Sequence, residues 1–242
     1  MQNAIMDLLP NRDEYFIGFA DMEQLLIKHY PFRYAVVVGA KLNDEIINGI
    51  EQAPTMDYFN LYQKTNNDLN ELVLKISNFL QTKGIENQTV FATVEDSELD
   101  RDYLKTIRYK YSHKMAATRA GIGWIGKTDL LVSEKFGPRC RLASVLTNYQ
   151  FENLGKPITE SQCGSCTICV EKCPAQAANG KLWNTEIDRD EFFNAGKCRS
   201  MCRKRALENI HIEISLCGLC LSVCPKGKMS KGTNSQHLQT KL

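Results

Sequence analysis

Cys163-Gly-Ser-Cys166-Thr-Ile-Cys169-Val-Glu-Lys-Cys173-Pro174 is the stretch that decides how the C-terminal part of this chain folds. Its spacing, C-x2-C-x2-C-x3-C-P, is one by which a short loop holds cubane iron–sulfur clusters. The two-residue gaps let the loop place three thiolates at three corners of one [4Fe–4S] cluster. The three-residue gap directs the fourth thiolate toward a second cluster, and the proline turns the chain away.

A second run repeats the end of this pattern further along the chain. It reads Cys217-Gly-Leu-Cys220-Leu-Ser-Val-Cys224-Pro225 and lacks the first cysteine, which Cys198 is placed to supply. In bacterial two-cluster ferredoxins the last cysteine of a run binds the other cluster. The expected ligand sets are Cys163, Cys166, Cys169 and Cys224 for cluster 1, and Cys173, Cys198, Cys217 and Cys220 for cluster 2. We therefore predict a bacterial two-[4Fe–4S] ferredoxin-like domain that transfers single electrons.

The chain has ten cysteines, which also indicates metal binding. A disulfide framework needs an oxidising compartment, whereas clustered thiolates in a reducing cytosol usually hold metal. Structural zinc is the alternative, because C-x2-C pairs also suit tetrahedral Zn²⁺, but zinc sites do not need two C-x3-C-P exits. Cys202 is an alternative to Cys198 as a ligand. Cys140 lies in an apolar strand pattern, and we expect it in the core.

The bulk composition is that of an ordinary globular protein. Of the 242 residues, 43% are hydrophobic and 24% are charged, and the formal net charge is +2. This charge does not favour DNA or a membrane surface as a partner. No window approaches the roughly 18 apolar residues of a membrane span, and the N-terminus lacks the pattern of a signal peptide. We expect a cytoplasmic protein.

Helical and strand patterns alternate before the cysteine-rich part, which predicts an α+β or α/β fold. The expected elements are a strand at 34–39, a helix at 66–80 that stops near Gly84, a strand at 90–94, a helix at 112–120, and a hairpin whose strands are 129–133 and 141–147. The expected domains are an α/β domain at 1–154, the double-cluster domain at 155–229 and a polar tail at 230–242.

Three further stretches and the two cysteine runs resemble the epoxyqueuosine reductase family of cobalamin-dependent iron–sulfur proteins. The stretches are Ala120-Gly-Ile-Gly-Trp-Ile-Gly-Lys127, Phe136-Gly-Pro-Arg139 and Leu142-Ala-Ser-Val-Leu-Thr-Asn148. In this order and spacing the resemblance covers roughly residues 105–227. The chain resembles a short form of the family, because few residues follow Cys224 and none are left for the C-terminal helical-repeat domain of longer members.

The resemblance implies a corrinoid held between the α/β domain and the cluster domain. Electrons would pass from a carrier protein through the clusters to cobalt, which would reduce an unidentified substrate. The resemblance thus implies a cobalamin-dependent iron–sulfur reductase. The alternative is a non-catalytic electron-transfer protein, or a corrinoid-reducing activator for a partner enzyme.

The glycine-rich stretch is the candidate contact with the corrinoid. Its residues of interest are Gly121, Gly123, Trp124, Gly126 and Lys127. The glycines allow positive φ and close approach of the backbone to a large flat ligand. The alternative role of the glycines is to end a helix and form a tight turn. The alternative for Trp124 is a place in the core, and the alternative for Lys127 is a place on the surface. The stretch is not a dinucleotide fingerprint, because a helix precedes it and a strand follows it.

The chain departs from the family at the expected acid. Counting back from Ala120 places the family's acidic position near Ile107, and the nearest carboxylates, Asp100 and Asp102, lie at the wrong offset. The candidate proton donors that remain nearby are Tyr109, Tyr111 and His113, each of which also suits a structural role. Without this acid and the helical-repeat domain, the sequence does not favour tRNA as a substrate.

Basic residues gather around the second half of the cluster domain. They are Lys197, Arg199, Arg203, Lys204, Arg205, Lys226, Lys228 and Lys231. One interpretation is a solvated face that balances the charge of the clusters. The functional interpretation is a docking surface for an acidic electron donor such as ferredoxin or flavodoxin.

Overall fold

The structure, a computed structural model, describes residues 1–23, 32–94 and 98–228. Its centre is a four-stranded sheet in the order β1-β2-β6-β3, in which every neighbouring pair is antiparallel. The strands are β1 (Tyr15–Asp21), β2 (Tyr34–Lys41), β3 (Asn87–Val90) and β6 (Cys140–Thr147). The apolar run that predicted the strand at 34–39 forms β2, which lies inside the sheet with seven of its eight residues buried.

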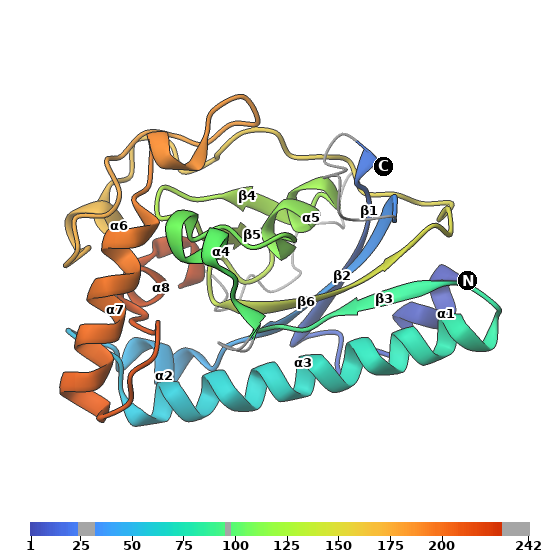
Figure 1. The fold of residues 1–242 in the computed structure, drawn as a ribbon, viewed down its shortest axis with the longest axis horizontal. Coiled ribbons are helices and arrows are strands. Elements are labelled where there is room, and N and C mark those ends of the chain that lie inside the picture. The colour runs from blue at the N-terminus through green and yellow to red at the C-terminus, as the bar shows by residue number, and fades with distance from the viewer. Residues whose placement is uncertain (24–31, 95–97, 229–242) are drawn as a thin grey trace, which may run out of the picture.

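One face of the sheet is covered by the long helix α3 (Met56–Thr82), which runs along the whole sheet in Figure 1. Thr55 caps the helix by accepting a hydrogen bond from the Tyr58 N–H, and Gly84 follows it at φ +71°. Its apolar side chains recur every three or four positions, so they form one stripe that packs on the sheet. The stripe and the sheet residues that it contacts include Leu69, Leu72, Val73, Ile76, Leu80, Val36, Val38, Ala143 and Val145.

The other face is covered by α5 (His113–Arg119) and by a two-stranded sheet of β4 (Gly123–Ile125) and β5 (Leu131–Ser133). The helix expected at 112–120 is therefore present. The hairpin expected from 129–133 and 141–147 is wrong, because β5 pairs with β4 while β6 pairs with β2 and β3. Between β5 and β6, the turn forms an isolated β-bridge from Ser133 to Gly137, and the chain then crosses to the larger sheet.

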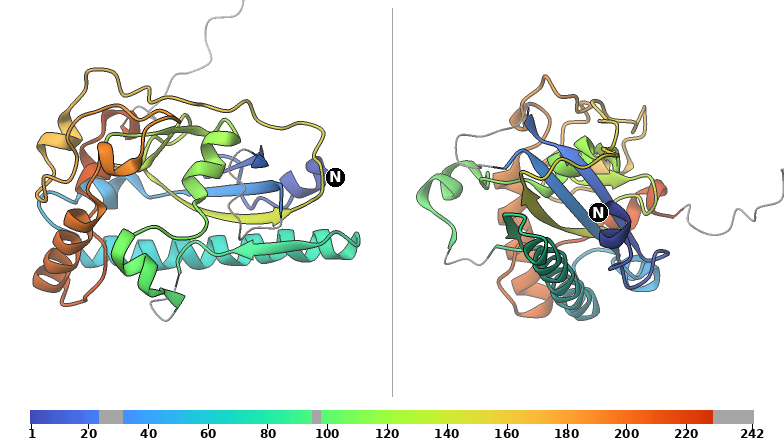
Figure 2. Two further views of the ribbon diagram at one scale, coloured as in Figure 1. Left: turned by 45° about the horizontal axis from the view of Figure 1, so that its top comes forward. Right: turned by 90° about the vertical axis from the view of Figure 1, so that its right-hand side faces the viewer.

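The cysteine-rich part wraps one end of these layers, at the left of Figure 1. Its helices are α6 (Ile168–Glu171), η3 (Arg189–Glu191), α7 (Ala195–Ile210), α8 (Leu219–Val223) and η4 (Pro225–Gly227). Three short helices complete the description: α1 (Gln2–Met6), α2 (Asp44–Asn48) and α4 (Arg101–Thr106). Figure 2 shows that α7 stands across the end of α3 rather than along it. The cluster-bearing part therefore caps one end of the sheet–helix layers.

The mixed α and β fold confirms the predicted class, and the antiparallel sheet makes it α+β in detail. The predicted helix at 66–80 is the C-terminal part of α3, and the strand predicted at 90–94 lies at 87–90. The predicted polar tail lies outside the described residues. Within the described ranges, none of the helices is both long and apolar enough to cross a membrane.

Candidate iron–sulfur centre

The structure brings the thiols of the first predicted set together. Cys169 is affected electrostatically by Cys224, Cys163 and Cys166, and burial with these neighbours raises its pKa to about 11. Cys224 is likewise affected by Cys163 and Cys166. Cys224 reaches this group because α8 ends on it and the following Pro225 begins η4. One cysteine of the second run therefore lies with three cysteines of the first run.

The second predicted set lies around the start of α7 and of α8. Burial raises the pKa of the Cys220 thiol, and Cys198 and Cys217 raise it further. Cys173 packs in the same apolar cluster as Cys198, with Ile125 and Phe192 at its centre. The Cys173 Sγ also accepts a hydrogen bond of 3.5 Å from the Ala177 N–H. The four members of this set thus come from three separate stretches of the chain.

Thiolates of [4Fe–4S] clusters bind four separate irons, so they surround a cubane rather than one point. Among the residues that the structure describes, no group of three or more His, Cys, Asp or Glu side chains is arranged to hold a single metal ion. The two thiol sets fit cubanes by their number, by their sulfur chemistry and by the exchange of Cys224 between the runs.

Two cysteines remain outside these sets. Cys202 is 8% exposed, its Sγ is 3.8 Å from the Sγ of Cys198, and it hydrogen-bonds to Cys217. It is therefore a neighbour of the second set. Cys140 begins β6 and packs in the core behind the sheet, where burial raises its pKa to about 12. The structure places Cys140 away from both thiol sets, as a core side chain.

The glycine-rich stretch supports the first cysteine loop. Lys127 is 4% exposed, and its Nζ donates to the Gly164 carbonyl at 3.0 Å and to the Cys166 carbonyl at 2.9 Å. The Trp124 Nε1 donates to the Cys163 Sγ at 3.4 Å, and a Cβ on Gly126 would lie 3.8 Å from the same sulfur. Hydrogen bonds to cluster sulfurs and to their loop tune the reduction potential. The buried lysine is thus committed to the loop that bears cluster 1.

Gly121 and Gly123 serve close packing of the backbone. Gly121 has φ +69°, and a Cβ there would lie 2.7 Å from the Lys156 carbonyl oxygen. A Cβ on Gly123 would lie 2.2 Å from the Val132 carbonyl oxygen of β5. The first contact places the chain that leads into the cluster domain directly against the turn after α5. The second places β4 directly against β5.

Of the three candidate proton donors, the structure brings Tyr111 and His113 together and leaves Tyr109 apart. Tyr111 is buried, and its ring meets the His113 ring edge-on at 5.3 Å between centroids. The His113 Nδ1 lies 2.8 Å from the Ser144 hydroxyl, and its Nε2 lies 3.0 Å from the Phe91 carbonyl. Because a carbonyl only accepts, the Nε2 carries the proton. Burial lowers the pKa of His113 to about 4, so the imidazole is neutral at pH 7.

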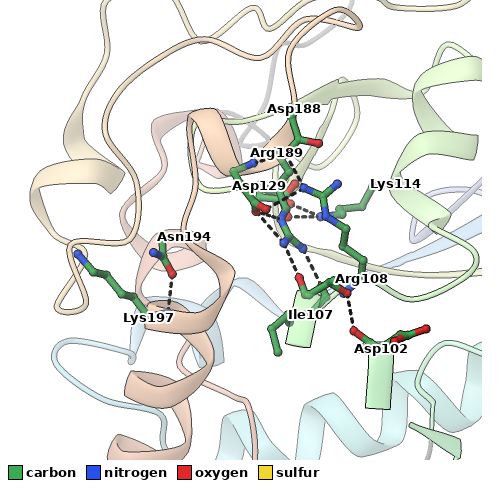
Figure 3. A network of polar contacts seen from close by, with 11 residues as sticks. Asp102, Ile107, Arg108, Lys114, Asp129, Asp188, Arg189, Asn194 and Lys197 are labelled. Atoms are coloured by element: carbon green, nitrogen blue, oxygen red, sulfur yellow. Dashed lines mark hydrogen bonds and ion pairs between the residues drawn. The ribbon is translucent and has the colours of Figure 1, made fainter. Parts of the chain in front are cut away.

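The segment around Ile107, near which the family resemblance places an acidic residue, is bound to the cluster domain, as Figure 3 shows. Arg189 donates from Nη1 to the Ile107 carbonyl at 2.7 Å and from Nη2 to the Thr106 carbonyl at 2.6 Å. Arg108 forms ion pairs with Asp188 at 2.5 Å and Asp190 at 3.0 Å. Ile107 itself has φ +50° at the end of α4, a left-handed conformation that costs a β-branched residue strain. Asp100 and Asp102 belong to the start of α4, where Asp100 caps the helix.

The sequence did not single out two cations that organise this end of the molecule, the buried Arg139 and the half-buried Arg189. Arg139 is 1% exposed and donates to Asp44, Asn48 and the Ser222 carbonyl at 2.9, 2.8 and 3.2 Å. Arg189 is the link to α4 described above. The sequence contained a signal for Arg139, because this residue is the last of the Phe136-Gly-Pro-Arg139 stretch that carries the family resemblance. Arg189 stands in an ordinary charged run, which offers no such signal.

The comparisons with known proteins agree with this geometry. Residues 162–227 match the family described as the 4Fe-4S double cluster binding domain. An epoxyqueuosine reductase of Lactococcus garvieae (strain Lg2) is 36% identical over 126 residues, which are 49% of this chain and 32% of that protein. The chain thus spans about a third of the length of this curated relative.

Two solved structures share the fold. A reductive dehalogenase studied for B12-dependent dehalogenation has a TM-score of 0.64 at 18% identity, over 87% of this chain and 29% of that one. An epoxyqueuosine reductase with an epoxyqueuosine-modified tRNA stem loop has a TM-score of 0.57 at 20% identity, over 94% and 64%. The double-cluster prediction and the family resemblance are confirmed. Over about half of its length this chain is similar to epoxyqueuosine reductases, and its residues 162–227 match a double [4Fe–4S] cluster-binding domain.

Proposed function

We propose that this protein is an iron–sulfur reductase that passes electrons through two [4Fe–4S] clusters to a bound corrinoid, which reduces the substrate. The observation that carries the proposal is the meeting of Cys224 with Cys163, Cys166 and Cys169. We assign these four thiolates to cluster 1, and Cys173, Cys198, Cys217 and Cys220 to cluster 2. A [4Fe–4S] cluster is a one-electron centre, so a chain that holds two of them is suited to one-electron transfer.

The proposed corrinoid site faces a segment made of residues 91–94 and 98–115. Four large apolar side chains of this segment are exposed: Phe91, Leu104, Tyr109 and Met115, at 43, 57, 36 and 39%. A contiguous exposed apolar patch marks a surface that a ligand or partner covers, and we propose that these four side chains form such a patch for the large, mostly apolar corrin ring. Cys198 of cluster 2 is affected electrostatically by Asp129 and Lys114, and Lys114 belongs to the same end of α5. Cluster 2 is therefore the cluster that we place next to cobalt.

The corrinoid, when bound, supplies a strongly reducing cobalt centre, and the chain's own residues position it and exclude water. In this proposal the glycine-rich residues 120–127 support cluster 1, because Lys127 and Trp124 donate hydrogen bonds to the cysteine loop that we assign to it. Tyr109 is the most exposed of the candidate proton donors, and we propose it ahead of Tyr111 and His113 for delivery of a proton.

The test is anaerobic purification followed by metal analysis and a cobalamin titration. Two cubanes require about eight irons and eight acid-labile sulfides per chain. Cobalamin added to this protein should shift its absorbance with saturation at one equivalent. Stoichiometric zinc without sulfide would overturn the cluster assignment. Clusters without cobalamin binding would favour the alternative, a non-catalytic electron carrier or an activator for a partner enzyme.

We propose that the substrate is not epoxyqueuosine in tRNA, although relatives carry that name. Deoxygenation of an epoxide needs a proton at the departing oxygen, and a positioned general acid contributes about 10²–10⁴-fold. Counting back from Ala120 places the family's acidic position near Ile107, whose side chain cannot donate a proton. The test is complementation of a strain without its own epoxyqueuosine reductase, with queuosine in tRNA measured by mass spectrometry. Full restoration of queuosine would overturn this proposal.

A further inference from the structure

The described part of the molecule contains a cavity of about 780 Å³ beside the helix that joins the two clusters. Its wall includes Leu219, Ser222 and Val223 of α8, and α8 carries Cys220 and ends on Cys224. Lys172 and Pro174, which flank Cys173, form another part of the wall. The cavity is therefore lined by chain neighbours of three proposed cluster ligands, drawn from both sets. Figure 1 shows α2, α7 and α8 converging at this end of the molecule.

The lining carries an excess of positive charge. Its cations are Arg139, Lys172, Arg205 and Lys228, and its carboxylates are Asp44 and Glu51. Asp44 is already neutralised by ion pairs with Lys41 at 2.8 Å and Arg139 at 2.9 Å. Within the described ranges, Lys172, Arg205 and Lys228 have no ion pair inside 4.0 Å.

Two buried donors in this lining also lack an acceptor. The Nε atoms of Arg139 and Arg205 are both shielded from solvent, and neither has a hydrogen-bond partner within the described ranges. Arg139 is 1% exposed as a residue. A buried unsatisfied N–H costs free energy, so each of these donors calls for an acceptor such as an ordered water or an anion. The cavity is thus prepared for carboxylate or other anionic oxygens.

We infer that this cavity is the docking site for an acidic one-electron carrier protein, and this inference rests on the proposed function. A protein partner fits better than a small anion, because Ile50, Leu219 and Val223 add apolar surface between the charges. Apolar surface bordered by polar residues is the usual anatomy of a protein interface. Acidic side chains of the carrier would meet Lys172, Arg205 and Lys228, and this contact would bring its redox centre to α8, next to both clusters.

The inference is tested by anaerobic stopped-flow reduction of the cluster-loaded protein with flavodoxin hydroquinone, at low and at rising ionic strength. The variant is Lys172→Glu with Lys228→Glu, both exposed. The control is Lys75→Glu with Lys83→Glu, which makes the same change of net charge in the far half of α3. Charge reversal at the rim of an interface acts mainly on the association rate, so we expect about a tenfold lower rate constant and a weaker salt dependence. The control should stay within about twofold of the unaltered protein, because steering is local.

Several outcomes would overturn the inference. Equal rates for the variant and the control would do so, as would failure of flavodoxin hydroquinone to reduce the unaltered protein when dithionite reduces both clusters. A calorimetric titration with inorganic phosphate adds a further arm: binding that the variant loses while its flavodoxin rate is unchanged would assign the cavity to a small anion instead. If the unaltered protein contains no clusters that dithionite can reduce, the proposed function itself fails. That result differs from each outcome above, because those outcomes all start from a protein that holds its clusters.

Discussion

At the scale of single residues, Cys202 lies beside the thiols that we propose as ligands of cluster 2, and it is the alternative to Cys198 in that set. It lies on α7 one turn after Cys198, so both thiols point to the same side of the helix. Its Sγ is 3.8 Å from that of Cys198, and it hydrogen-bonds to Cys217. If Cys198 and Cys217 are the ligands that we propose, the Cys202 S–H donates toward ligand sulfurs, and such hydrogen bonds raise the reduction potential of a cluster.

Replacement of the two α7 cysteines should separate these roles. Cys198→Ala removes a proposed ligand, so we expect loss or conversion of cluster 2. Cys202→Ala should keep both clusters and lower the reduction potential of cluster 2, because a donor to its sulfurs is lost. Electron paramagnetic resonance during a redox titration measures both effects. Cys140→Ala is the control and should change neither. If Cys202→Ala instead lost cluster 2 and Cys198→Ala kept it, Cys202 would be the ligand in place of Cys198.

His113 should make stability depend on pH. Its pKa is about 4 in the folded protein against 6.5 as the ordinary value, because burial disfavours the charged ring. Between these values the unfolded chain binds more protons, so the free energy of unfolding falls as the pH drops from about 6.5 to about 4, by at most about 3 kcal/mol. Chemical denaturation at pH 7 and pH 5 should show a smaller difference for His113→Gln. His211→Gln, at an exposed histidine, should keep the difference of the unaltered protein.

At the scale of elements, α4 is a six-residue helix whose C-terminus is fastened from outside. Its last carbonyls would be unsatisfied at a free helix end. Arg189 of η3 binds the carbonyls of Thr106 and Ile107, and so replaces the usual C-terminal cap. The strained φ of Ile107 persists because these two hydrogen bonds hold it.

Removal of this fastening should loosen α4 and leave the rest of the fold unchanged. For Arg189→Gln we expect faster hydrogen exchange at residues 101–110, because the two carbonyls lose their donors. Arg203→Gln is the matched control, since Arg203 pairs with Glu213 elsewhere on the cluster domain. Mass spectrometry of deuterated peptides measures the rates. Unchanged exchange at 101–110 in Arg189→Gln would show that Arg108 and its two aspartates hold the segment alone.

Elements with a long periodic pattern were predictable, and pairing between elements was not. The buried run of β2 and the apolar spacing of α3 specify these elements locally. The partner of β5 depends on Gly123, which alone lets β4 approach the Val132 carbonyl, and no local signal ranks that contact above a hairpin to β6. β1 was missed because Tyr15–Asp21 mixes a glycine and an aspartate into a short strand.

At the scale of the whole molecule, a buried lysine joins the layers to the cluster domain. Lys127 follows β4 and donates to two carbonyls of the first cysteine loop. A buried ammonium is costly unless it is well hydrogen-bonded, so this contact holds the two parts in one geometry. The cysteine spacing predicted which thiols lie together, whereas this role of Lys127 depends on a contact between segments that the sequence does not reveal.

Loss of this lysine should therefore damage one cluster selectively. Lys127→Met removes both donors, so we expect cluster 1 to be lost or oxygen-labile while cluster 2 and the sheet remain. Lys135→Met is the control, because the Lys135 ammonium also donates to two backbone carbonyls, those of Arg12 and Tyr15, but far from the cysteines. Iron content, paramagnetic resonance and far-ultraviolet circular dichroism report the result. Equal cluster loss in both variants would contradict the assignment.

The meeting of Cys224 with the first cysteine run also sets an order for biosynthesis. A chain grows at about 5–20 residues per second and folds its earlier parts first. The layers of β1, β2, α3 and β6 precede the cysteine runs, so they are complete before either cubane has a full set of ligands. Cys163, Cys166 and Cys169 then wait for a partner that is synthesised last of the eight. On the proposed ligand assignment, the first cubane can consequently be completed only after Cys224 has been synthesised, when the sheet and α3 already have their full sequence.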